Sequence, residues 1–477
     1  DDAALLDAYR AEIAPDAADA WWREFVAATE RPPRPAVRCV DAAAAAALRA
    51  STACEEIPWA PGRGYWLNEE PSKRVAHVAG DYYVQEAAAM VAVAALLRGE
   101  DLRRRVVAID ACAAPGGKTI QLATALRDAG ADAVVVANEP SSSRLGALVA
   151  NAVRCGVGPW LRCTRTTGQK LFAALPRECA DFILLDAPCS GDTLARREGR
   201  GLAKHLRGQP DAASMKEIVA TQLEIVRAAW PCLRPGGALV YATCSLRPRE
   251  DEEIARRVLK EFGDASLEDL AGLAAGGDAM LRLWPQTHDS AGFFAAKLRK
   301  AGDGGGAAVA TDADEDVADA ARDYLRDAWG VTSLVGPASS RLVGRGANLW
   351  LAPAAPPLAK NLRYERAGAK LVEALKVRGK AVPLGQALRS GRVRATHEFA
   401  TTLGGAVDAA RRASLDDASA LAYLRGDDVD AAPPSGEPGD QCLVAHGGRV
   451  LGLAKVLKGG RLKNQLPREC VRRDLAF

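Results

Sequence analysis

Two cysteines follow apolar segments that have the composition of β-strands. Cys189 lies three residues after the run Asp181–Asp186, and Cys244 comes directly after the run Ala238–Thr243. A thiolate is a strong, soft nucleophile, so one cysteine could add to an electron-poor carbon. The other thiol, or Asp186, could then donate and accept protons. The pattern predicts covalent nucleophilic catalysis.

Burial is the simpler explanation for a single cysteine, because cysteine is among the residue types most often found inside proteins. We expect burial for Cys112 and for most of the other cysteines. Cys189 and Cys244 differ, because Pro188 fixes the backbone beside one thiol and Ser245 follows the other at a predicted strand end.

A glycine-rich turn follows a third strand-like run, Val106–Asp110. Gly116 and Gly117 would let the backbone approach a ligand closely, and Lys118 supplies a cation beside them. The turn is not a P-loop, since Cys112 occupies the first glycine position of that motif, and the dinucleotide fingerprint is absent too.

An acid ends the next strand-like run, 21 residues after Lys118. Glu139 stands where the acid of a nucleotide-binding α/β unit binds the paired hydroxyls of a ribose. A glycine pair alone is most simply a strand-to-helix turn. The acid on the second strand favours a ligand site.

Short apolar runs alternate with longer amphipathic segments from Asp81 to Lys297, which is typical of an α/β fold with a mostly parallel sheet. We predict a doubly wound, Rossmann-like domain. Ligands bind at the carboxyl edge of such sheets, so the glycine turn, Asp186 and the two cysteines should meet there.

Changes in composition divide the chain. The stretch 301–316 holds four Gly, five acids and no Lys or Arg, which is typical of a solvated linker. Within the part that follows it, the pattern predicts a helix at Ala367–Lys376. The predicted parts are an N-terminal module (1–75), the α/β domain (76–300), the linker (301–316), an intermediate domain (317–390) and a C-terminal domain (391–477).

Composition excludes several classes of protein. The 477 residues carry 63 Lys and Arg against 60 Asp and Glu, and 48% are hydrophobic, so the chain is neither disordered nor a polyelectrolyte. No apolar run is long enough to span a membrane. Eleven cysteines without zinc-site spacing predict free thiols, no metal, and a reducing compartment, which could be cytoplasm, nucleus or an organelle.

Seven segments resemble, in order and spacing, the motifs of the Nop/Sun family of RNA 5-methylcytosine methyltransferases. The end of the chain, 453–455 and 461–471, is similar to the PUA-like RNA-binding module of that family's bacterial small-subunit rRNA enzymes. The seven segments are Tyr83–Met90, Asp110–Thr119, Asn138–Pro140, Leu185–Gly191, Leu233–Gly237, Tyr241–Ser245 and Pro285–Phe294.

The resemblance implies a class I methyltransferase that forms 5-methylcytosine. Cys244 would attack carbon 6 of cytosine and Cys189 would help release the product, an order that spacing alone leaves open, with the swapped assignment as the alternative. Asp186 and Lys118 would lie beside the base and the methyl donor.

The implied cofactor is S-adenosylmethionine. Glu139 would hold its ribose, and Asp186 would lie close to it. Thr167 stands where the family has an acid that contacts adenine, so we expect S-adenosylmethionine to bind more weakly by ~1 kcal/mol. The turn that would surround the methionine end consists of Cys112, Ala113, Ala114, Pro115, Gly116, Gly117 and Lys118.

The implied partner is rRNA, free or on an assembling small subunit, and we expect a monomer that does not bind membranes. The N-terminal module and the C-terminal domain would bind RNA, and basic clusters supply the candidate phosphate contacts. One alternative is an RNA-binding ribosome-assembly factor with a vestigial site, and another is a methyltransferase acting on protein or DNA. The candidate RNA-binding residues are Arg196, Arg197, Arg461, Lys463 and Arg468.

Overall fold

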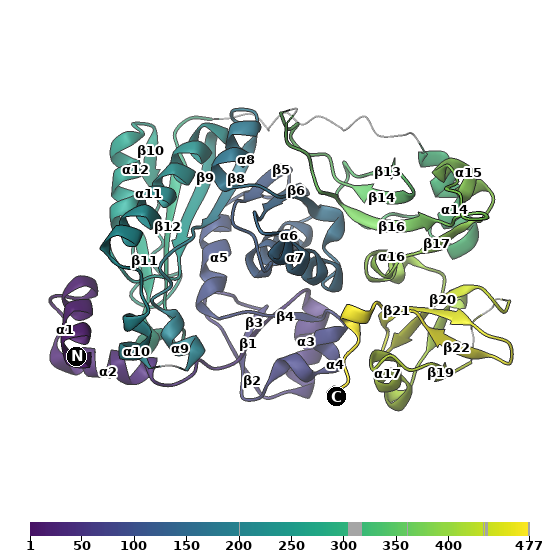
Figure 1. Cartoon of the computed structure of the whole chain (residues 1–477), viewed down its shortest axis with the longest axis horizontal. Coiled ribbons are helices and arrows are strands. Elements are labelled where there is room, and N and C mark those ends of the chain that lie inside the picture. The colour runs from purple at the N-terminus through teal and green to yellow at the C-terminus, as the bar shows by residue number, and fades with distance from the viewer. Residues whose placement is uncertain (200, 304–316, 360, 433, 435–436, 476–477) are drawn as a thin grey trace.

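The computed structural model of the chain describes residues 1–199, 201–303, 317–359, 361–432, 434 and 437–475. Four β-sheets follow one another along the chain, and the largest has nine strands. The N-terminal segments lie below this sheet in Figure 1, and the two C-terminal sheets lie beside it. Among the described residues, no helix has the length and apolar character needed to cross a membrane.

The nine-stranded sheet has the order β10-β12-β9-β8-β5-β6-β7-β15, with β11 also paired to β12. Strands β9, β8, β5, β6 and β7 are parallel, and β12 is antiparallel to β9. The predicted Rossmann-like α/β domain is confirmed. The strands are β5 (Arg105–Asp110), β6 (Asp132–Asn138), β7 (Leu161–Thr164), β8 (Ala180–Asp186), β9 (Leu233–Thr243), β10 (Ala265–Leu267), β11 (Met280–Leu283), β12 (Phe293–Lys300) and β15 (Arg366–Ala367).

Helices cover both faces of this sheet. Val106 and Ala108 of β5 pack into the core under α5 (Val91–Leu97) and α6 (Gly117–Asp128), whereas Val107 and Ile109 pack into the opposite core. Burial on both sides explains why these strands are continuous apolar runs. The second core lies under α8 (Gly168–Ala174), α11 (Ala212–Ala229) and α12 (Glu252–Glu261); the remaining helices of the domain are α7 (Ser142–Arg154), α9 (Leu194–Glu198), α10 (Leu202–Arg207) and α13 (Pro285–His288).

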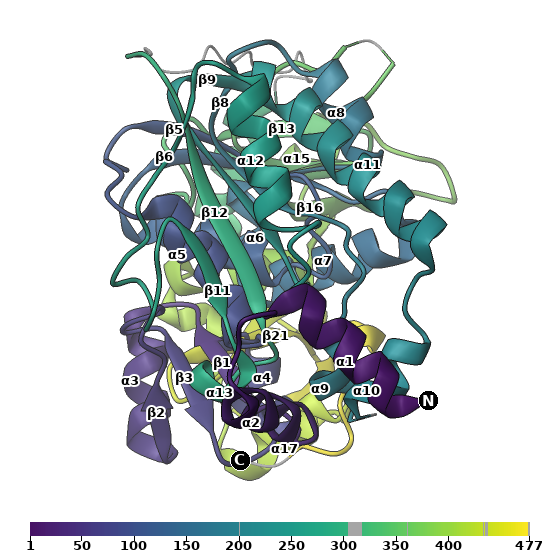
Figure 2. The ribbon, with the colours of Figure 1, turned by 90° about the vertical axis from the view of Figure 1, so that its left-hand side faces the viewer.

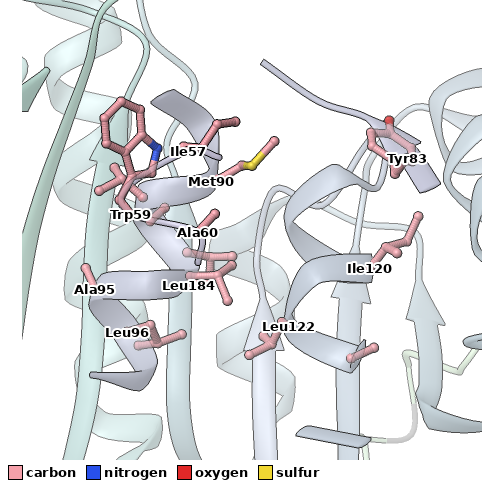
Figure 3. Packing of buried hydrophobic residues seen from close by; sticks show 14 of the residues in the cluster. Ile57, Trp59, Ala60, Tyr83, Met90, Ala95, Leu96, Ile120, Leu122 and Leu184 are labelled. Atoms are coloured by element: carbon pink, nitrogen blue, oxygen red, sulfur yellow. The ribbon is translucent and has the colours of Figure 1, made fainter. Parts of the chain in front are cut away.

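The N-terminal sheet is fused to the central domain. Its order is β2-β3-β1-β4, and because β4 pairs with β1 the module continues past the predicted boundary at residue 75. Trp59 of this module, Met90 and Leu184 of β8 belong to one buried cluster (Figure 3). The elements are β1 (Ala36–Cys39), α3 (Ala42–Ser51), β2 (Cys54–Glu56), β3 (Gly64–Leu67), α4 (Val75–Val78) and β4 (Tyr82–Val84).

The first two helices pack away from that sheet. Helices α1 (Asp2–Ile13) and α2 (Asp19–Thr29) lie against α9, α10 and α13 of the central domain (Figure 2). Tyr9 and Phe25 share a buried cluster there with Leu202 and Leu246.

The intermediate domain is built on the sheet β13-β14-β16-β17. The predicted helix at Ala367–Lys376 is wrong: residues 369–374 form β16, which pairs with β14 on one side and β17 on the other. Since β17 and α16 pack into this domain, it also continues past the predicted boundary at residue 390. Its elements are α14 (Ala318–Trp329), β13 (Arg341–Arg345), β14 (Asn348–Ala352), β16 (Ala369–Ala374), α15 (Leu384–Arg389), β17 (Val393–Ala395) and α16 (His397–Leu403).

The C-terminal sheet has the order β18-β20-β21-β22-β19. Val75 of the N-terminal module packs into its core. The predicted linker 301–316 lies, from residue 304 onward, outside the described residues. The elements are β18 (Arg412–Ser414), α17 (Asp417–Leu424), β19 (Val429–Asp430), β20 (Gln441–His446), β21 (Arg449–Val456) and β22 (Arg461–Asn464).

Candidate active site

The two cysteines meet at the carboxyl edge of the central sheet. The Sγ atoms of Cys189 and Cys244 are 3.1 Å apart, both thiols are free, and both residues are partly exposed. Parallel pairing of β8 with β9 sets Asp186 opposite Ala242, so the loops that carry the two thiols leave the sheet side by side. One ligand can therefore contact both.

The contact between the thiols affects the pKa of Cys189. This pKa is raised well above its ordinary value, mainly by the hydrogen bond with Cys244, and further by burial and by the charges of Cys244, Glu250 and Asp186. The raised pKa favours the protonated form of Cys189, and either sulfur can be the donor in the contact. Burial also raises the pKa of Cys112, which makes its thiol unreactive, as expected for a packed cysteine.

A partly buried ion pair lies beside the thiols. The Nζ of Lys118 donates to the Oδ2 of Asp186 at 2.7 Å and lies 4.9 Å from the ring centre of Phe293. Burial alone would lower the pKa of Lys118, but the attraction of Asp186, with a smaller contribution from Cys244, raises it above its ordinary value. The site thus contains a fixed cation next to a carboxylate that is 28% exposed.

The glycine turn joins β5 to α6. Gly116 has φ +114°, and a Cβ there would lie 3.0 Å from the Cδ1 of Leu148, so only glycine suits this position. Asp110 at the end of β5 accepts a hydrogen bond from Thr119 through Oδ2, and its buried Oδ1 has no hydrogen-bond partner among the described residues. Burial raises the pKa of Asp110 to about 6.

Glu139 directly follows β6 and is buried. Its Oε1 accepts the backbone N–H of Ser141 at 2.8 Å, and its Oε2 lies 3.3 Å from Arg144. Arg144 also donates to the backbone oxygen of Ala114 in the glycine turn. The carboxylate is therefore held in place next to that turn.

This edge has the features of a site for a nucleoside with a cationic group. An unpartnered buried carboxylate oxygen on Asp110 can accept from an ammonium, the amides that begin α6 can bind a carboxylate, and Glu139 can bind ribose hydroxyls. Among the described residues, no three His, Cys, Asp or Glu side chains form a group that could hold a metal ion.

The remaining predicted residues lie away from the thiols or have other partners. Thr167 is exposed and caps α8 by accepting the N–H of Lys170. Arg196 is 5% exposed, and its guanidinium donates to protein groups that include Asp289, so it is a structural residue, contrary to the expected RNA contact. Arg197 lies in α9, but its side chain is outside the described part. Exposed basic residues of the C-terminal domain are Arg461, which is 3.4 Å from Asp430, and Lys463 and Arg468.

Sequence reasoning missed Glu250, which is completely buried behind the two cysteines. Its carboxylate accepts hydrogen bonds from Ser190 and Ser245, the residues that follow Cys189 and Cys244. The signal available in the sequence was the acidic run that begins six residues after Cys244.

The central sheet is parallel and is extended by an antiparallel last strand, a glycine turn follows β5, and an acid follows β6. These features define a Rossmann-like methyltransferase. Comparison with known families identifies the kind of methyltransferase. Residues 99–299 match the family described as 16S rRNA methyltransferase RsmB/F, 8–87 match the N-terminal domain of 16S rRNA methyltransferase RsmF, and 410–472 match the methyltransferase RsmF PUA domain.

Individual relatives agree. The chain is 34% identical to ribosomal RNA small subunit methyltransferase F of Serratia proteamaculans, over 98% of this chain and 96% of the relative. It is 35% identical to the protein of that name from Shewanella loihica, over 88% and 84% of the two chains. The chain belongs to the RsmB/F family of 16S rRNA methyltransferases, and the predicted Nop/Sun-type resemblance and C-terminal PUA domain are confirmed.

A solved structure supports the fold. The crystal structure of NSun6 from Pyrococcus horikoshii with SFG covers 63% of this chain and 98% of its own, with a TM-score of 0.51. At 20% identity, this likeness concerns the fold alone.

Proposed function

We propose that the protein transfers a methyl group from S-adenosylmethionine to carbon 5 of a cytosine in small-subunit rRNA, through a covalent bond between Cys244 and carbon 6. The observation that carries the proposal is the contact of two thiols at 3.1 Å, beside Lys118 and Asp186. Methylation of an amine or hydroxyl needs no such pair.

Cys244 is the proposed nucleophile on the strength of the family resemblance, and the raised pKa of Cys189 agrees with this order. Attack by the Cys244 thiolate forms the S–C6 bond and moves an electron pair to carbon 5, which then takes the methyl group. A base takes the carbon-5 proton, the electron pair of that C–H bond forms the C5–C6 double bond, and the S–C6 bond breaks to regenerate the Cys244 thiolate. Cys189 takes part in this release: after its own proton has passed to water, its thiolate is the proposed acceptor of the carbon-5 proton.

Asp186 and Lys118 are proposed to orient the base. Asp186 is partly exposed at the edge and can accept from the exocyclic amine of cytosine, while Lys118 holds that carboxylate in place. The ammonium also offsets negative charge that develops on the ring after thiolate attack.

The residues of the glycine turn, Asp110 and Glu139 would hold the cofactor, with Thr167 near its adenine. S-adenosylmethionine supplies an electrophilic methyl group when bound. The unpartnered Oδ1 of Asp110 is the observation in this chain that fits its amino group.

The RNA is proposed to bind through the PUA domain, with Arg461, Lys463 and Arg468 at its exposed surface contacting phosphates. A base in a duplex cannot reach a thiol, so the target cytosine must be unpaired or flipped out of its stack.

The experiment that tests the proposal is a denaturing gel of Cys189→Ala and Cys244→Ala proteins incubated with 16S rRNA and S-adenosylmethionine. We expect Cys189→Ala to accumulate a protein–RNA adduct that survives denaturant and Cys244→Ala to form none. Adduct in Cys244→Ala alone would reverse the roles, and adduct in neither would contradict the covalent mechanism.

One observation favours a second candidate, an RNA-binding assembly factor with a weak site. Thr167 is a neutral, exposed cap of α8 where the family resemblance leads one to expect an acid. Calorimetry with S-adenosylmethionine separates the two candidates, because a vestigial site would give no binding heat. Tritium transfer to RNA, DNA and protein acceptors tests the substrate class.

A further inference from the structure

Glu250 connects the two cysteine-bearing loops. It lies in the loop between β9 and α12 with no exposed surface. One carboxylate oxygen accepts the N–H of Ser190 at 2.8 Å and the amide of Gln222 at 3.1 Å, and the other accepts the hydroxyls of Ser190 and Ser245, the latter at 2.9 Å. Gln222 of α11 also donates to the backbone oxygen of Pro188 at 3.0 Å.

We propose that Glu250 is a positioning residue for the covalent reaction: its carboxylate holds the loops that carry Cys189 and Cys244 against each other. This inference rests on the proposed function, because it assigns what keeps the two thiols together for the reaction.

The geometry carries the proposal. Ser190 and Ser245 each follow a cysteine, and both are bonded to the same carboxylate, so the two loops cannot move apart at these residues without breaking one of these bonds. All four groups that face Glu250 in these bonds are donors. An ionised carboxylate, which only accepts, satisfies all of them.

The carboxylate also places a charge close to the pair. Glu250 forms no ion pair with a basic side chain of the described residues. It is one of the groups that raise the pKa of Cys189. Removing its charge should therefore lower that pKa.

Other charged groups pack around this loop and enter any pH dependence. They come from β8 and the loop after it, from β9 and its loop, and from β11, whose Arg282 pairs with Asp251 and Glu252. Helix α11 contributes only the neutral Gln222. The other titratable or charged groups are Asp186, Asp192, Tyr241 and Arg247.

The test is Glu250→Gln, which keeps the shape and can still bond both serine hydroxyls, since hydroxyls also accept. Alkylation of Cys189 and Cys244 by iodoacetamide in the RNA-free protein is followed between pH 6 and 10 by peptide mass spectrometry. Removing a nearby charge moves a pKa by about one unit, so we expect Cys189 to react about tenfold faster at pH 8, with Cys244 changed much less. Glu253→Gln, on the exposed side of α12, is the matched control.

Turnover supplies the second readout. For Glu250→Gln we expect kcat to fall at least about tenfold with the KM for RNA unchanged, because no RNA-facing residue is altered. The paired variant Ser190→Ala with Ser245→Ala keeps the charge but removes the ties, so kcat should fall with the KM for RNA unchanged. Cys189 should also be alkylated faster, because its contact with Cys244 is the main cause of its raised pKa. This variant also decides the case if Glu250→Gln does not fold.

An unchanged Cys189 profile together with unchanged kcat in Glu250→Gln would overturn the inference. A wild-type protein that methylates no RNA would instead overturn the proposed function. The alkylation profiles then still decide whether Glu250 controls the cysteine pair.

Discussion

At the scale of single residues, the site shifts the pKa values of several groups. The contact with Cys244 raises the pKa of Cys189, Asp186 raises that of Lys118, and burial raises that of Asp110. Perturbed pKa values of this kind are typical of active sites.

Asp110 should make stability depend on pH. Its folded pKa of about 6 lies above the ordinary 3.8, so the buried charge destabilises the ligand-free protein above about pH 6, and this cost disappears as pH falls towards 4. Asp110→Asn should therefore raise the free energy of unfolding at pH 8 by up to about 3 kcal/mol, and the unfolding temperature with it. At pH 4.5 both gains should be much smaller. Thermal melts at both values check this, and an equal gain at the two values would contradict it.

Thr167→Asp should strengthen donor binding. Aspartate caps a helix as well as threonine does, so α8 should keep its start, while a carboxylate is a stronger acceptor for an adenine amine. A gain of about 1 kcal/mol corresponds to roughly fivefold tighter S-adenosylmethionine in calorimetry. Thr166→Asp, one residue earlier, is the control, and the same gain in both variants would show a general charge effect.

At the scale of elements, the positions of the loops depend on helices from elsewhere in the chain. Tyr9 of α1 donates to Asp192, which in turn accepts the N–H of Leu246 two residues beyond Cys244. Glu12 of α1 pairs with Arg247 in the same loop. Helix α1 therefore holds the loops that carry the two cysteines from outside.

Gly116→Ala should damage the turn between β5 and α6. Alanine at φ +114° is strained, and its Cβ would press against Leu148, so we expect a loss of about 1–2 kcal/mol together with weaker cofactor binding. Gly130→Ala is matched, because Gly130 has φ +71° and open space around it. Melting and calorimetry on both proteins would refute the argument if Gly130→Ala lost as much cofactor affinity.

At the scale of the whole molecule, the domains are joined by shared surfaces. The PUA domain contacts the N-terminal module, where Arg449 of β21 pairs with Asp81. Strand β15 of the intermediate part pairs with β7 at the edge of the central sheet. RNA held by the PUA domain is thus held relative to the thiols.

Salt dependence should report the PUA contacts. Arg461, Lys463 and Arg468 should be changed together to alanine. The plot of log binding constant against log salt concentration has a negative slope, and we expect its magnitude to fall by about 2–3, because binding then releases one fewer counterion for each lost phosphate contact. Filter binding of 16S rRNA at several salt concentrations measures the slope. The control changes three other basic residues together, Arg322, Arg326 and Lys370, so that the loss of charge is equal. An equal decrease in the magnitude of the slope would contradict the assignment of phosphate contacts to the PUA domain.

The local sequence pattern was sufficient to predict the central sheet and most of the residues at its carboxyl edge. Parallel strands buried on both faces must be continuous apolar runs, so the ends at Asp110, Asp186 and Cys244 were visible in the sequence. The ordered motifs then placed the chain in its family. Conformation at these positions depends mainly on neighbours in sequence.

Long-range contacts decided the rest. Residues 369–374 have a helix-like pattern but pair with β14 and β17, strands that sequence pattern did not predict to be partners. Arg196 belongs to a basic cluster, yet packing against Asp289 and Ser290, about 90 residues away, buries it. Glu250 became a candidate only once folding placed Ser190 and Ser245 around it, because the free energy of a buried carboxylate depends on the donors that the tertiary structure brings to it.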